Sequence, residues 1–184
     1  MASPSSPLSK AVIVSDADDD QLPTTISIRI ELFPVTGVPV DEHVLSAAGR
    51  AGLHNLVVIN RGSLGYGDAL LSARHAVGRE AFVLFSASHV VDDEDRLLER
   101  LLQSHAWSRT SVVAIPAASD PRRLRAGDLE RAGCYVLTPE IFGALDDVSD
   151  AGARGFGDAL LLLARQRRLK VIGLENPALL PLAS

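Results

Sequence analysis

Lysine and cysteine are scarce in this chain of 184 residues. Two lysines, Lys10 and Lys170, stand beside sixteen arginines, and Cys134 is the one cysteine. A single cysteine excludes an intrachain disulfide, which fits a reducing compartment, and we expect Cys134 to be a small core residue. Few lysines also means few of the mobile point charges that phosphoryl chemistry often recruits.

Long apolar runs and a strong charge of either sign are absent as well. The longest aliphatic run, Ala159–Ala164, falls far short of the roughly 20 residues that span a bilayer. Met1–Ser9 lacks the basic and apolar parts of a signal peptide. The formal net charge of −5 is too mild to indicate a nucleic-acid or membrane partner. We therefore expect a cytoplasmic protein.

Short apolar segments alternate with amphipathic ones along the chain, beginning with the apolar run Lys10–Val14. Strands are predicted there and at Ile26–Phe33, Asn55–Asn60, Ala81–Ser86, Ser111–Ile115, Gly133–Leu137 and Leu169–Leu174. Helices are predicted over Val40–Arg50, Asp68–Val77 with Asp68 as N-cap, Asp93–His105, a segment opened by Thr138 and Pro139, and Asp158–Arg167 after a loop at Gly152–Gly157. The alternation predicts one α/β domain over residues 10–176, with a Rossmann-like, doubly wound, mostly parallel (mixed) sheet flanked by helices. Residues 1–9 are expected to be a disordered tail, residues 177–184 a second tail, and no internal repeat is expected.

Several segments resemble, in the right order, motifs of bacterial UTP–glucose-1-phosphate uridylyltransferases (UDP-glucose pyrophosphorylases). They are Glu31–Pro34, Ala51–Val58, Leu64–Ala69 and Gly133–Phe142. The last, GCYVLTPEIF, is nearly identical to the family's G-R-Y-V-L-T-P-E-I-F. The resemblance implies a nucleotidyltransferase fold, in which ligands bind where the central strands end.

The departures from the family fall where it does chemistry. Its Gly-rich phosphate loop corresponds here to the acidic Asp16–Gln21, its two lysines to Ile26 and Ile30, and its magnesium-binding Asp to Ser88. A carboxylate about 5 Å from a phosphate oxygen repels it by roughly 3 kcal/mol at an effective dielectric near 20. The resemblance therefore implies a shortened, catalytically degenerate form that needs no cofactor, with Mg²⁺ expected only if the chain is active.

Candidate site residues remain at a few positions. Weak catalytic candidates are Asp16, Asp18 and Arg29, and ligand-binding candidates are Asn60, Gly65, Gly67, Gly133 and Glu140. A tight strand-to-helix turn is the favoured explanation of Gly65 and Gly67, and packing alone can explain Gly133. No metal site is expected, because the acidic cluster lacks the glycine and glutamate of a calcium loop.

One row of apolar side chains is a candidate partner surface: Ile26, Ile28, Ile30 and Leu32. A row of this kind must pack on the domain's own sheet or on another chain. We expect an inactive binding, regulatory or assembly module that forms a homodimer or a heteromer with a full-length relative, while weak binding of a nucleotide or sugar phosphate stays open. One alternative is an active enzyme that makes a nucleotide sugar from a nucleoside triphosphate and a sugar 1-phosphate. A more remote one is a haloacid-dehalogenase-like phosphatase using Asp16 and Asp18.

Overall fold

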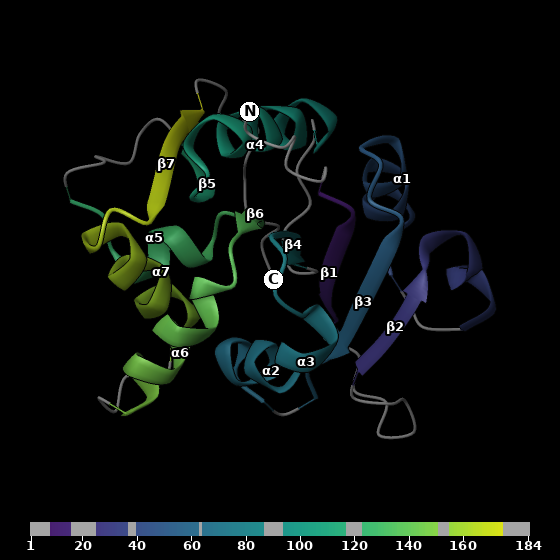
Figure 1. Cartoon of the computed structure of the whole chain (residues 1–184), viewed down its shortest axis with the longest axis horizontal. Coiled ribbons are helices and arrows are strands. Elements are labelled where there is room, and N and C mark those ends of the chain that lie inside the picture. Colours follow the sequence, from purple (N-terminus) through teal and green to yellow (C-terminus); the bar gives the residue numbers. More distant parts are fainter. Residues whose placement is uncertain are drawn as a thin grey trace, which may run out of the picture.

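The chain forms a seven-stranded mixed sheet flanked by helices, as predicted from the sequence (Figure 1). This computed structural model describes residues 8–15, 25–36, 40–62, 64–86, 94–116, 123–150 and 155–174. The strands are β1 (Lys10–Ser15), β2 (Thr25–Arg29), β3 (Asn55–Asn60), β4 (Phe82–Ser86), β5 (Ser111–Pro116), β6 (Cys134–Leu137) and β7 (Leu169–Leu174), in the order β2-β3-β1-β4-β6-β5-β7. β2 and β6 run antiparallel to their neighbours, whereas β1 is parallel to β3 and β4, and β5 is parallel to β7.

Helices cover both faces of the sheet, so its central strands are apolar on both sides. Ala11 and Ile13 of β1 face the side covered by α1 (Glu42–Arg50) and α4 (Glu94–Ser108). Val12 and Val14 face the other side, covered by α2 (Tyr66–Ser72), α3 (Arg74–Val77), α5 (Ala126–Glu130), α6 (Glu140–Asp150) and α7 (Phe156–Arg165). Figure 1 shows α5, α6 and α7 gathered toward the end of the sheet that carries β7.

The strand predicted over Ile26–Phe33 is shorter than expected. β2 ends at Arg29, and a 3-10 helix, η1 (Ile30–Thr36), follows it. The Ile30 N–H still donates to the His54 carbonyl (2.9 Å), but beyond it the alternation breaks, because Phe33 is buried and Leu32 is 56% exposed. The pairing stops there because the partner strand β3 begins at Asn55, the residue paired with Arg29.

Other element boundaries agree with the sequence more closely. The strands at Asn55–Asn60 and Leu169–Leu174 have the predicted bounds. α1 begins after Asp41, whose side chain accepts a hydrogen bond from the His43 N–H (2.8 Å). None of the helices in the described part of the chain has the length and apolar character needed to cross a membrane.

Candidate functional site

Three neighbouring strands end side by side at one edge of the sheet. Because β1, β3 and β4 are parallel, their last residues Ser15, Asn60 and Ser86 lie at the same edge, with Ser15 paired to Asn60 and Val14 to Ser86. Both serines are buried and Asn60 is half-buried. We call this the carboxyl edge. In open α/β sheets it is where ligands bind.

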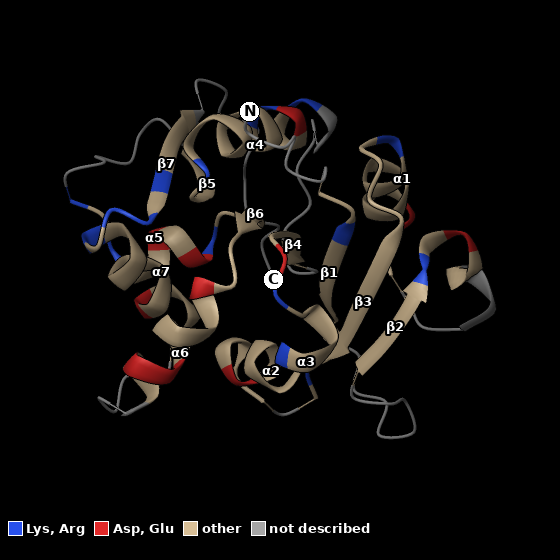
Figure 2. Ribbon diagram, in the orientation of Figure 1, with Lys and Arg blue, Asp and Glu red and all other residues tan. Residues whose placement is uncertain are grey.

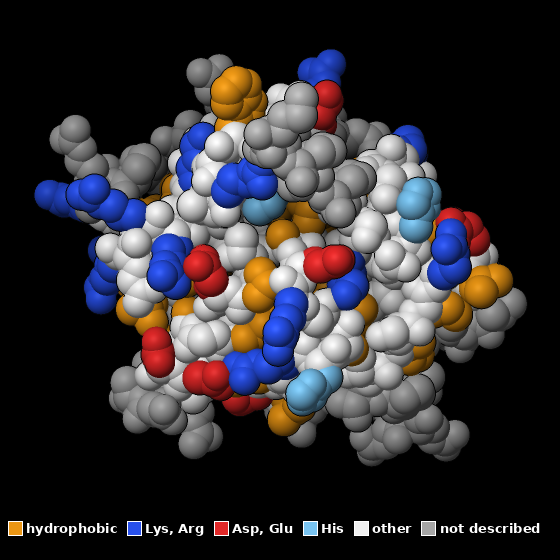
Figure 3. All heavy atoms as spheres, in the orientation of Figure 1, with side chains coloured by type: hydrophobic (Ala, Val, Ile, Leu, Met, Phe, Trp, Pro, Cys, Tyr) orange, Lys and Arg blue, Asp and Glu red, His pale blue; other side chains and the backbone are white. Residues whose placement is uncertain are grey.

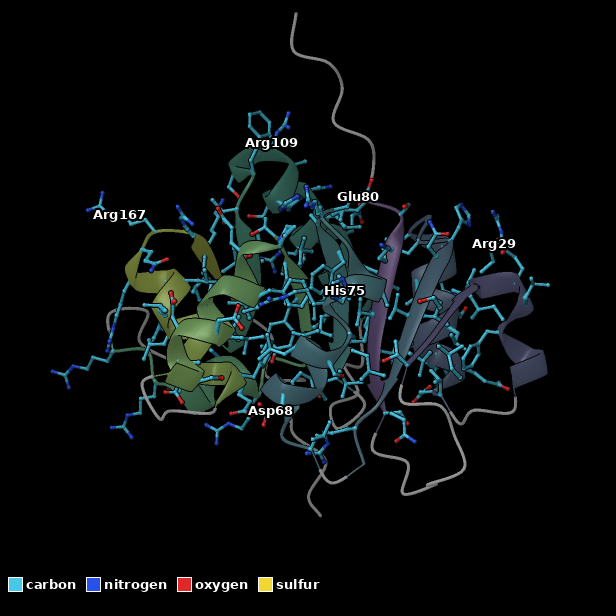
Figure 4. The ribbon with its side chains drawn as sticks, turned by 60° about the horizontal axis from the view of Figure 1, so that its bottom comes forward. Arg29, Asp68, His75, Glu80, Arg109 and Arg167 are labelled. Atoms are coloured by element: carbon cyan, nitrogen blue, oxygen red, sulfur yellow. The ribbon has the colours of Figure 1, made fainter. Side chains whose placement is uncertain are left out.

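The candidate residues divide between the two edges of the sheet. Asn60 and the loop to Gly65 belong to the carboxyl edge, as does Gly133, whose carbonyl accepts from the Ser86 N–H (2.9 Å). Arg29 and Glu140 belong to the opposite edge, because β2 and β6 run the other way. Figure 4 shows this separation, with Asp68 near one end of the strands and Arg29 near the other. Asp16 and Asp18 lie outside the described residues.

Arg29 and Glu140 each have a charged neighbour. Arg29 is 3.3 Å from Glu31, and that contact, with backbone hydrogen bonding as the larger cause, lowers the pKa of Glu31. Glu140 accepts from the Thr138 hydroxyl (3.2 Å) and lies 3.2 Å from Arg168. These contacts hold both side chains away from the ends of β1, β3 and β4.

The helix after β3 begins earlier than predicted. Gly65 is its N-cap, and Asp68, expected to be the N-cap, is the third residue of the helix. The Asp68 carboxylate lies over Gly65, with Oδ2 3.6 Å from where a Cβ on that glycine would stand. Gly67, a second candidate for a ligand loop, lies inside α2 and is buried. The prediction was wrong because glycine without a side chain took the N-cap position and Asp took a position in the first turn, where the helix dipole favours a carboxylate.

The same error recurs at the last helix, for the same reason. α7 begins at Phe156 and not at Asp158, with Gly155 as N-cap. A Cβ on Gly155 would stand 2.5 Å from Asp158 Oδ2. The two helix starts read GYGDALL at residues 65–71 and GFGDALL at residues 155–161, identical at six of seven positions. This short recurring motif was present in the sequence and was missed by the sequence analysis.

The two copies of this GxGDALL motif pack against each other. The Tyr66 and Phe156 rings lie 4.9 Å apart between centroids. A Cβ on Gly67 would be 3.1 Å from Leu145 Cδ2 and 3.5 Å from the Phe156 nitrogen. At the equivalent Gly157, a Cβ would be 2.3 Å from the Ala126 carbonyl oxygen of α5. Close packing therefore excludes a side chain at Gly157 and leaves little room for one at Gly67.

Gly133–Phe142 is the segment that most resembles the uridylyltransferases, and its polar groups form hydrogen bonds within the fold. The Tyr135 hydroxyl donates to the carbonyls of Leu129 (2.9 Å) and Glu130 (2.6 Å), and burial raises the pKa of Tyr135 well above its usual value. The Thr138 N–H donates to the Ser111 hydroxyl (3.0 Å). Gly133 has φ = 77°, a left-handed conformation that favours glycine. These contacts make the segment a structural junction between β6, α5 and α6.

No group of three or more His, Cys, Asp or Glu side chains that could hold a metal ion occurs among the described residues. Mg²⁺ prefers several hard, anionic oxygen ligands. The described strand ends at the carboxyl edge offer the neutral side chains of Ser15, Asn60 and Ser86, which do not fit it. Cys134 is buried, as expected.

Comparison with solved structures assigns the architecture. The chain is similar to a UDP-glucose pyrophosphorylase solved with UDP-glucose (TM-score 0.54, 15% identity, 91% of each chain covered). It is also similar to a structure assigned as a glucose-1-phosphate thymidylyltransferase from Bacillus anthracis, solved with sucrose (TM-score 0.53, 13% identity, 90% of this chain and 87% of the other covered). The chain has the sugar-nucleotidyltransferase fold. No protein-family model matches it, and no curated protein matches it by sequence.

At these identities the likeness establishes the fold alone. It confirms the α/β class and the architecture that the resemblance implied. The same comparisons give no support to the phosphatase alternative.

Proposed function

We propose that this chain is a catalytically degenerate sugar-nucleotidyltransferase-like domain that acts as a binding, regulatory or assembly module. The observation that carries the proposal is that the side chains at the described strand ends of the carboxyl edge are neutral. Three central strands end there in Ser15, Asn60 and Ser86. A nucleotidyl transfer must neutralise a triphosphate, normally with cations and positively charged side chains.

The residues that stand in for the family's two lysines support this proposal. Ile26 and Ile30 are half-buried and pack on the core cluster that includes Phe33, Val44 and Val58. Their side chains thus contribute to the fold of β2 and η1. A lysine buried there would lose hydration of its charge, which is costly without a partner.

The features that survive from the resemblance have structural reasons of their own. Gly67 packs closely against Leu145 and Phe156, and the Tyr135 hydroxyl bonds the carbonyls of Leu129 and Glu130 in α5. The sequence around the carboxyl edge points the same way, since Asp16–Gln21 is acidic where the family binds phosphates and Ser88 replaces its magnesium ligand. Compared with the family's motifs, this chain keeps residues that stabilise the fold and has other residues where the family carries out its reaction.

For assembly we propose that the β2 end of the sheet contacts a second copy or a full-length relative. β2 pairs only with β3 within the described residues. Ile26, Ile28 and Ile30 are half-buried on this domain's own core, which leaves Leu32, 56% exposed, as the most accessible apolar side chain of the row.

Isothermal titration calorimetry with Mg-UTP, UDP-glucose and glucose 1-phosphate tests the proposal. We expect dissociation constants of about 1 mM or weaker for all three, because the side chains at the described strand ends, Ser15, Asn60 and Ser86, are neutral. Micromolar binding of Mg-UTP that Asn60→Ala weakens would favour the alternative, an active enzyme that makes a nucleotide sugar. Gly143→Ala, an exposed change in α6 with nothing within 4 Å, serves as the matched control.

A further inference from the structure

An exposed tryptophan and several basic residues lie near β7, the outermost strand at the end of the sheet opposite to β2. Trp107, the only tryptophan, lies in the last turn of α4 and is 88% exposed. Arg109 follows it with φ = 57°, and Arg167 has φ = 59° just before β7. They are the two non-glycine residues with positive φ in the described part of the chain. Both arginines directly follow the last turn of a helix, α4 or α7, where a single left-handed residue is common, and the Arg109 N–H donates to the His105 carbonyl (2.7 Å).

Strand pairing places the ends of α4 and α7 next to neighbouring strands, β5 and β7. β5 and β7 are parallel, with Ser111 beside Leu169, and the Ser111 N–H donates to the Arg168 carbonyl (3.2 Å). Three exposed basic residues precede or belong to β7: Arg165 ends α7, Arg167 lies in the connection, and Lys170 lies in β7. We call Trp107, Arg109, Arg165, Arg167 and Lys170 the basic edge. Figure 2 shows basic residues on β7 and on the connection before it, and Figure 4 shows the Arg167 side chain extending outward.

Charge balance leaves the basic edge strongly positive. Glu140 lies 3.2 Å from Arg168, which is not counted in the edge. Arginines near the ends of α4 and α7 also complement the helix dipoles, which accounts for Arg109 and Arg165. It does not account for Lys170, which is in a strand, or for the exposed indole. In Figure 3 a hydrophobic group protrudes above α4, with basic side chains beside it.

β7 also presents unpaired backbone groups at this place. It is the last strand of the sheet, and no described strand pairs with its outer side. The bond from Ser111 to the Arg168 carbonyl means that Arg168, Lys170 and Ile172 direct their backbone groups toward β5. Leu169, Val171 and Gly173 therefore direct theirs outward, because backbone groups alternate along a strand. Ile172 packs with the core on the α4 side, so Lys170 is on that side too.

We propose that β7 accepts an extended acidic peptide segment of a partner protein as an additional strand. The outward N–H and C=O groups would bind the peptide backbone, the arginines and Lys170 its carboxylates, and Trp107 an apolar side chain. A second copy is disfavoured, because antiparallel pairing of two β7 strands would bring two copies of the basic edge together. Nucleic acid would use the charge and the indole but not the strand edge. This proposal goes beyond the proposed function and holds whether or not the carboxyl edge is catalytic.

Trp107 supplies the assay, because its fluorescence reports binding at this position without a label. The probe is a capped hexapeptide of alternating Glu and Val, with its Lys-Val counterpart as a charge control and an eight-residue oligothymidylate as the nucleic-acid control. We expect the Glu-Val peptide to bind and the Lys-Val peptide not to bind. Raising salt from 20 to 200 mM should weaken binding about fivefold or more, because exposed charges are screened. Lys170→Glu should weaken it about fivefold or more, whereas Arg29→Glu, at the opposite end of the sheet in Figure 4, should leave it unchanged.

Val171→Pro separates strand addition from simple charge attraction. The Val171 N–H points away from β5, so proline removes a group that the peptide needs and none that the sheet uses. A folded Val171→Pro variant should lose peptide binding. The proposal is overturned if this variant binds the peptide as well as the wild type, if the oligothymidylate binds and the peptide does not, or if neither binds. Should Val171→Pro fail to fold, unchanged binding by Lys170→Glu overturns the proposal on its own.

Discussion

The repeated GxGDALL motif predicts that two equivalent glycines differ in how they tolerate a methyl group. A Cβ at Gly157 would stand 2.3 Å from the Ala126 carbonyl oxygen, about 1 Å short of an ordinary contact, and the obstacle is backbone. At Gly67 the nearest atom is Leu145 Cδ2, 3.1 Å away at the end of a flexible side chain. At Gly143, in the middle of α6, nothing lies within 4 Å.

These distances set the expected changes in the free energy of unfolding. Gly→Ala inside a helix stabilises by about 0.5–1 kcal/mol in the absence of a clash. Gly143→Ala should gain about that amount. Gly67→Ala should lie near zero, because a small shift of Leu145 offsets the gain. Gly157→Ala should lose roughly 1–3 kcal/mol, because α7 must move away from α5 to relieve the overlap.

Urea unfolding followed by far-ultraviolet circular dichroism measures all three variants. Dichroism is preferred to fluorescence because Trp107 is 88% exposed in the folded state and reports little burial. The three m-values should be equal, which would show that the variants differ in stability alone. A Gly157→Ala protein as stable as Gly143→Ala would refute the contact between α5 and α7 and the account of the motif built on it.

Three further predictions concern other contacts. Tyr135→Phe should lose about 1–2 kcal/mol, because the Leu129 and Glu130 carbonyls lose their donor. Burial raises the pKa of Tyr135, so above pH 10 the unfolded chain releases this proton while the folded chain keeps it. Wild-type stability should therefore fall as the pH rises past 10, and denaturation series should show a smaller fall for Tyr135→Phe; an equal fall would show that Tyr135 is not the cause. Arg74→Met should lower the free energy of unfolding by about 1 kcal/mol in thermal unfolding, since Arg74 bonds the Phe142 carbonyl (3.0 Å) and Asp146. Asp146→Asn leaves the bond to the carbonyl and should lower it by less. A larger loss for Asp146→Asn than for Arg74→Met would contradict this account of the two bonds. Light scattering with Leu32→Asp tests assembly, and we expect this variant to have a lower mass in solution than the wild type. The proposed contact at β2 is contradicted if the wild type is monomeric at every concentration and captures no relative in a pull-down.

Strands were predictable because their sequences are apolar on both faces or bounded by clear turns. The runs at Asn55–Asn60 and Leu169–Leu174 have these properties and were assigned with the right bounds. Ile26–Phe33 was assigned too long, because its alternation of apolar residues continues in the sequence past Arg29, where the backbone turns into η1. Periodicity alone does not show that the partner strand β3 begins at Asn55, opposite Arg29.

Helix starts and the site were harder to predict, because they depend on contacts between distant segments. Asp68 and Asp158 have the residue type of an N-cap, and nothing local shows that Gly65 and Gly155 take that position. Arg29 and Glu140 were candidates by resemblance, yet the antiparallel directions of β2 and β6 place both at the edge opposite to Asn60. Strand direction is a property of the whole sheet.

The most direct test of the central claim is a pyrophosphate-release assay with UTP, glucose 1-phosphate and Mg²⁺, using the purified chain at high concentration. The proposed degenerate domain predicts no release above a sample without the protein, because the described strand ends at its carboxyl edge carry the neutral side chains of Ser15, Asn60 and Ser86. Magnesium-dependent release with matching formation of UDP-glucose would contradict the claim. That result would be decisive if Asp16→Asn or Asp18→Asn abolished the activity while Gly143→Ala, prepared in parallel, retained it, because a contaminating enzyme would be indifferent to all three changes.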